Sequence, residues 1–107
     1  MIREGRPYSI ENGWEDKGLI TDRPKEEQEI ALRWIAENIR PRKTPLHERS
    51  SYGIKHILQH DTGLYLTNNE FKDAMLLSGY EPIDPNALNW NYCISKKSPA
   101  FDWRRAR

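Results

Sequence analysis

A chain of 107 residues, of which 36% are hydrophobic, can bury one small core, so the sequence predicts a single domain. Its 17 basic and 16 acidic residues leave a formal net charge of +1, which excludes a uniformly basic nucleic-acid coat and an acidic mimic of DNA. The single Cys93 excludes an internal disulfide, no segment is apolar enough to span a membrane, and no secretory signal is recognisable. We therefore expect a soluble, cytoplasmic protein without membrane contact.

The first 39 residues are expected to form an arm and a helix. Residues 1–22 hold isolated apolar side chains among several glycines without a sustained period, which predicts an arm with at most one short strand. A helix is predicted from about Pro24 to Ile39, because apolar residues recur at helical spacing and glutamates cluster near its start. Arg40 ends it, since a residue before proline is disfavoured in the helical region. Residues 40–45 then form a stiff basic connector.

Two further helices follow. Ser50 or Ser51 caps the first of them, and Gly63 ends it because glycine adopts a left-handed conformation at little cost. Residues 67–70, TNNE, form a capping box in which a hydroxyl and a carboxylate each satisfy a free backbone amide. This motif predicts the start of a third helix, which Gly79 ends.

The last predicted element is a two-stranded ribbon. Residues 80–83 can extend, and the apolar residues Trp90, Tyr92 and Ile94 alternate with polar ones in the period of a half-buried strand. The order of elements predicts an α+β fold, a small three-helix domain with a short β-ribbon that is winged helix-turn-helix-like.

The chain is expected to divide into an N-terminal arm (1–22), a single globular domain (23–95) and a basic aromatic tail (96–107). One core should unite the apolar faces of the predicted helices and of the last strand. Its predicted members are Trp34, Ile35, Ile54, Ile57, Leu58, Leu66, Phe71, Met75, Trp90, Tyr92 and Ile94.

Charge is unevenly distributed along the chain. Residues 38–60 and 96–107 each carry five basic residues against one acidic residue, whereas 1–37 and 61–95 are net acidic. Both blocks have aromatic neighbours and are candidates for contacts with phosphates or an acidic partner, the alternative being solvated surface. The candidate binding residues here are Arg40, Arg42, Lys43, Arg49, Tyr52, Lys55, Lys96, Lys97, Trp103, Arg104 and Arg105.

The third helix supplies a second set of candidates. In a helix-turn-helix its first turn would read bases, with Asn68 and Asn69 suited to adenine and Lys72 to guanine or phosphate. Asparagine is also common at helix starts for capping alone.

No catalytic constellation is recognisable in the sequence. His56 and His60 lie four residues apart on one predicted helix, but no third ligand has metal-site spacing. Cys93 lies within a predicted strand without a supporting base, and the glycines are too isolated for a phosphate loop. We expect no enzymatic activity, no metal and no cofactor.

Three stretches carry a resemblance: IRPRKTP (39–45), the segment from SSYGIKHILQH to ALNW (50–90), and CISKKSPAF (93–101). They resemble small, mostly uncharacterised proteins of phages and other mobile elements of Gram-positive bacteria. That resemblance implies an anti-defence factor, such as an anti-CRISPR protein, or a DNA-associated accessory protein, in the cytoplasm of a bacterial host.

Two functions therefore compete at the level of sequence. The first is a stoichiometric inhibitor that docks on a host nuclease or another nucleic-acid-handling complex, because exposed Tyr, Trp and Arg side chains are typical interface anchors. The alternative is a small winged-helix regulator that binds DNA. Neither DNA nor RNA is favoured by the residues alone, and the oligomeric state stays open.

The absence of a third ligand beside His56 and His60 predicts that the fold needs no metal. Treatment with a chelator should leave the circular dichroism spectrum and the melting temperature unchanged. Stoichiometric zinc in the purified protein would contradict this prediction.

Overall fold

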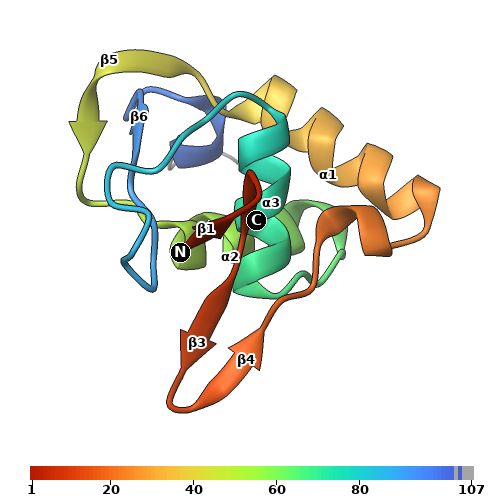
Figure 1. Ribbon diagram of the computed structural model, residues 1–107. Coiled ribbons are helices and arrows are strands. Elements are labelled where there is room, and N and C mark those ends of the chain that lie inside the picture. The colour runs from red at the N-terminus through yellow and green to blue at the C-terminus, as the bar shows by residue number, and fades with distance from the viewer. Residues whose placement is uncertain (103, 105–107) are drawn as a thin grey trace.

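The computed structural model describes residues 1–102 and 104, and over these residues the chain forms three α-helices and three two-stranded antiparallel sheets (Figure 1). The predicted α+β class is confirmed. The helices are α1 (Lys25–Asn38), α2 (Ser51–Thr62) and α3 (Asn68–Leu77), and two short 3-10 helices, η1 (Ile20–Asp22) and η2 (Pro99–Phe101), precede α1 and end the described fold.

The helix boundaries follow local signals. Helix α1 ends where Ile39 turns extended, two residues before Pro41, as predicted. Helix α2 ends at Gly63, whose φ of 78° is left-handed, so the predicted stop is also confirmed. Ser50 occupies the N-cap position of α2, although its side chain makes no capping hydrogen bond.

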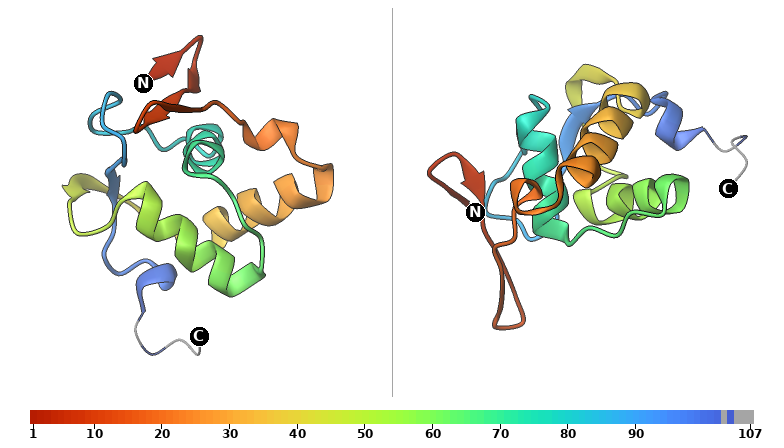
Figure 2. Two further views of the ribbon diagram at one scale, coloured as in Figure 1. Left: turned by 90° about the horizontal axis from the view of Figure 1, so that it is seen from below. Right: turned by 90° about the vertical axis from the view of Figure 1, so that its right-hand side faces the viewer.

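Helix α3 lies at the centre of the molecule. Its predicted capping box is present: the Glu70 backbone N–H donates to Thr67 Oγ1 at 3.2 Å, and the Thr67 N–H donates to Glu70 Oε1 at 2.8 Å. The left panel of Figure 2 looks along α3, with α1, α2 and the N-terminal strands arranged around it. As a result, every residue from Asn69 to Met75 is buried.

The ribbon differs from the predicted one. Strand β6 (Tyr92–Ile94) pairs with β5 (Pro41–Leu46), with Pro41 opposite Ile94 and Leu46 opposite Tyr92. The expected partner, residues 80–83, makes only one isolated bridge, between Pro82 and Tyr92. The expected connector is thus a strand, which its two prolines and solvent-facing basic residues conceal because neither is typical of strands. A winged helix-turn-helix is not confirmed.

The first 22 residues are more ordered than expected. They form two hairpins, β1 (Ile2–Arg3) with β2 (Arg6–Pro7) and β3 (Ser9–Glu11) with β4 (Trp14–Asp16). The second hairpin turns at Asn12-Gly13, and both residues have positive φ, 51° and 81°. Such a two-residue turn is the strongest short hairpin signal, so the prediction of at most one strand was wrong and avoidable.

One hydrophobic core unites the helices, β5 and β6. The predicted core residues are all buried except Ile57, which is partly buried against the core. The core also contains Ile20, Ile39, Leu46 and Ala100, which come from the segments that the sequence left outside it.

Phe71 is fully buried on α3, so Phe71→Ala should destabilise the fold by about 3–5 kcal/mol through lost burial and a cavity. Leu77→Ala is the matched control, because Leu77 lies on the same helix but is 50% exposed. Its effect should stay within about 0.5 kcal/mol. Thermal and denaturant unfolding measure both variants, and equal melting of Phe71→Ala and the parent would refute the core assignment.

Candidate functional site

The two basic blocks of the sequence meet beside the β5–β6 ribbon. The Ser95 N–H donates to the carbonyl oxygen of Arg40 at 2.7 Å, and the Arg40 N–H donates to Ser98 Oγ at 2.8 Å. Lys96 and Lys97, which lie between these two serines, are both exposed. Backbone pairing therefore holds the start of the first block against the start of the second.

A second contact joins the blocks further along. The Arg49 guanidinium lies 4.8 Å from the centre of the Phe101 ring, which η2 presents. Next to it, a surface hollow of about 530 Å³ is lined by Lys96, Lys97 and Arg104 together with Asp102. We call the exposed cations of this region the basic face: Arg40, Lys43, Arg49, Lys96, Lys97 and Arg104.

Not every predicted basic residue is free to bind. The Arg42 guanidinium folds back on its own strand, where Nε donates to the Thr44 oxygen at 2.8 Å and Nη2 to the Pro45 oxygen at 2.6 Å. Arg104 pairs with Asp102, Nε to Oδ1 at 3.1 Å, and this hydrogen bond raises the pKa of the arginine. Trp103 and Arg105 lie outside the described residues.

An aromatic groove lies on α2. The Lys55 ammonium is 5.1 Å from the ring centres of both Tyr52 and Tyr65, and His56 meets the Tyr52 ring edge-on. Lys55 is only 6% exposed, and burial lowers its pKa, while the two tyrosine rings are 52% and 53% exposed. Tyr65 was absent from the sequence-based candidates, although it directly precedes the capped helix.

The predicted base-reading residues do not form an exposed surface. Asn69 is fully buried, and its Nδ2 donates to the backbone oxygens of Pro7 at 3.0 Å and Gly18 at 2.9 Å. Lys72 is fully buried as well, and Asn68 donates to the Leu88 oxygen at 3.1 Å. The base-reading prediction is therefore wrong for Asn69 and Lys72, because the N-terminal segment covers that side of α3.

Two arginines of the N-terminal segment reach buried carboxylates on α3. Arg6 holds Asp73 with two bonds of 2.6 Å, and Arg23 holds Glu70 with bonds of 2.8 and 2.9 Å. The hydrogen bond with Asp73 raises the pKa of Arg6. Burial alone would raise the pKa of Glu70, but hydrogen bonds from Arg23 and Thr67 outweigh it and lower that pKa.

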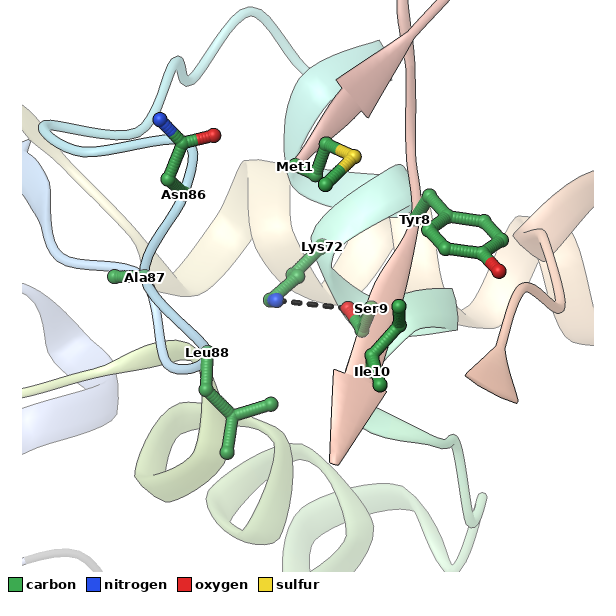
Figure 3. Close-up of a pocket in the computed structure, with 8 residues that line it drawn as sticks. All are labelled: Met1, Tyr8, Ser9, Ile10, Lys72, Asn86, Ala87 and Leu88. Atoms are coloured by element: carbon green, nitrogen blue, oxygen red, sulfur yellow. Dashed lines mark hydrogen bonds between the residues drawn. The ribbon is translucent and has the colours of Figure 1, made fainter. Parts of the chain in front are cut away.

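Lys72 differs from these pairs because no carboxylate of the described residues forms an ion pair with it. Its Nζ donates to Ser9 Oγ at 2.9 Å and lies 4.8 Å from the Trp90 ring centre. Burial lowers its pKa to about 8, against an opposing effect of Asp16. Figure 3 shows the ammonium in a pocket of about 140 Å³, between β3 and the loop at Leu88.

Metal-site and membrane features were searched over residues 1–102 and 104. Within this range no group of three or more His, Cys, Asp or Glu side chains is placed to hold a metal ion. His56 and His60 are both exposed, and Cys93 is partly buried. No helix in the same range has the length and apolar character that crossing a membrane requires.

The chain matches no protein-family model, and neither a curated protein nor a solved structure shows significant similarity to it. The resemblance to phage and mobile-element proteins therefore stays a prediction from the sequence.

The pKa of about 8 for Lys72 has a consequence for stability. Because an unfolded lysine titrates near 10.5, the unfolded chain binds more protons between these two values, and raising the pH should stabilise the parent relative to Lys72→Met. The relative gain should reach roughly 3 kcal/mol by pH 10.5. Denaturant unfolding across this range measures it, and a pH-independent difference between the two proteins would contradict the assignment.

Proposed function

We propose that the protein is a binding protein whose basic face contacts the phosphate groups of a nucleic acid. The observation that carries this proposal is the meeting of two basic blocks, separated by more than 40 residues, in a chain of net charge +1. Six exposed Lys and Arg side chains gather there, and Asp102 is the carboxylate that lines the hollow with them. Clustering of this kind provides the electrostatic contact that phosphate binding requires.

Contact with the backbone is favoured over reading of bases. A helix that reads the major groove must expose its first turns, whereas α3 is buried from Asn69 to Met75. This burial argues against the winged-helix regulator. Lys96 and Lys97 are exposed and flexible point charges, which suit phosphates of any sequence.

The aromatic groove supports an unpaired strand as ligand. Tyr52 and Tyr65 each expose about half of their surface, and unpaired bases stack on such rings with little sequence preference. Tyr52 follows Arg49 of the basic face by three residues, at the start of α2. A single strand can therefore use phosphate contacts at the basic face and stacking at the tyrosines.

The predicted anti-defence role places this binding in a particular setting. In a bacterial cytoplasm, an inhibitor of a host nuclease complex would meet the nucleic acid held by that complex, or an acidic surface of the complex itself. The basic face suits either contact by charge. This setting rests on the sequence resemblance alone.

The test removes two charges of the hollow, in the variant Lys96→Ala/Lys97→Ala. Its affinity for a labelled single strand should fall, and the slope of log affinity against log salt should decrease by about 1.4, since each phosphate contact on a single strand contributes roughly 0.7. Fluorescence anisotropy with single-stranded and duplex DNA and RNA at several salt concentrations measures both quantities. Thermal melting should be nearly unchanged, because both lysines are exposed.

The matched control is Lys17→Ala/Lys25→Ala, which removes the same charge from exposed lysines near β4 and the start of α1. Figure 2 places the N-terminal strands and η2 at opposite ends of the molecule in both views. Equal losses in the two variants would indicate a net-charge effect and refute a basic face. Failure of the parent to bind any nucleic acid, with retained binding to an acidic polypeptide, would redirect the proposal to a protein partner.

A further inference from the structure

The ammonium of Lys72 is a buried charge with incomplete hydrogen bonding. A lysine ammonium has three N–H donors, and in the described part of the chain only Ser9 Oγ accepts from it. Ser9 Oγ itself donates to Asn69 Oδ1 at 2.8 Å, so this hydroxyl is fixed and positions the ammonium. The Trp90 ring offers its face but no oxygen or nitrogen acceptor on that side. The remaining donors therefore lack an anionic or carbonyl partner.

The pocket around this ammonium is small and has an apolar rim. It measures about 140 Å³, the share of roughly four water molecules in the liquid. Figure 3 shows Lys72 at its inner end, with Ile10 on one side and Leu88 on the other. Ile10 and Leu88 are exposed large apolar side chains, as is Met1 above them. A polar inner end beneath an apolar rim is typical of sites for small amphiphilic ligands.

We propose that this pocket binds a short-chain monocarboxylate, with the carboxylate on the Lys72 ammonium and the hydrocarbon chain against Ile10 and Leu88. One buried positive charge is balanced by one negative charge, whereas a divalent phosphate would bring a second charge into the same small space. The volume admits a chain of a few carbon atoms only. Butyrate satisfies these limits and is used as the probe.

Access to the ammonium requires one side chain to move. Lys72 is 0% exposed, so the ligand must displace part of the pocket rim. The backbone of Leu88 is held by Asn68, whose Nδ2 donates to its carbonyl oxygen at 3.1 Å, but the Leu88 side chain is exposed. Rotation of this side chain opens the inner end while the loop keeps its place.

The site is independent of the basic face. The pocket lies under the N-terminal strands, and η2 lies at the opposite end of the molecule (Figure 2). Binding of a carboxylate here and binding of nucleic acid at Lys96 and Lys97 can each fail without the other.

The experiment is an NMR titration of the full chain with sodium butyrate, with butyramide as the neutral isostere and sodium chloride to hold the ionic strength constant. Butyrate should produce saturable shifts at Ser9, Lys72 and Leu88 with millimolar affinity, and butyramide should bind at least about tenfold more weakly. Equal binding of the two compounds, or no saturable shift with butyrate, would overturn the proposal.

Two variants separate the charge of Lys72 from the burial of a lysine in general. Lys72→Met should abolish the butyrate shifts, and Lys55→Met, which removes the other buried lysine that faces aromatic rings, should leave them unchanged. If Lys72→Met does not fold, Leu88→Glu decides, since its carboxylate at the rim should compete for the ammonium and weaken butyrate at least about tenfold. Retained affinity in a folded Lys72→Met, or in Leu88→Glu, would refute the site.

Discussion

The central helix α3 buries polar and charged side chains, and the rest of the structure is arranged to satisfy them. A buried carboxylate or amide without hydrogen bonds costs several kilocalories per mole, so each needs a partner at close range. Asp73 accepts from Arg6 and from the Ile20 N–H, and Glu70 accepts from Arg23. These partners come from the first 23 residues, which consequently form an integral layer of the fold.

This arrangement also explains why α3 is unsuited to base reading. Asn69 spends its amide donors on the Pro7 and Gly18 oxygens, and its Oδ1 accepts from Ser9. In a DNA-reading helix the same donors would point toward base edges. Here they attach the hairpins to the core. The capacity for recognition is left to the surfaces that the hairpins do not cover, at the ribbon and on α2.

Sequence reasoning succeeded where the determining interaction is local. The capping box at Thr67, the stop at Gly63 and the break before Pro41 each depend on a few neighbouring residues, and all three are present. The hairpin at Asn12-Gly13 had an equally local signal. In contrast, β5 pairs with residues almost 50 positions away, and its prolines and cations give no alternating pattern from which the pairing could be read.

The candidate site was predictable to a similar degree. Composition identified both basic blocks, because charge is visible without a fold, but their meeting depends on the β5–β6 pairing. Burial of Lys72 was unpredictable from its neighbours, since a lysine in the first turns of a capped helix is ordinarily solvated. Only the position of the hairpins relative to α3 makes it a buried charge.

The contacts between the N-terminal segment and α3 span 47 to 67 residues of sequence, from Arg23–Glu70 to Arg6–Asp73. Such non-local contacts form late, because the intervening chain must first be ordered. During synthesis the hairpins leave the ribosome first, yet their arginines have no carboxylates to meet until α3 has followed. The order of emergence from the ribosome is thus the reverse of the order of need, and the domain gains its stability in one concerted step near the end of translation.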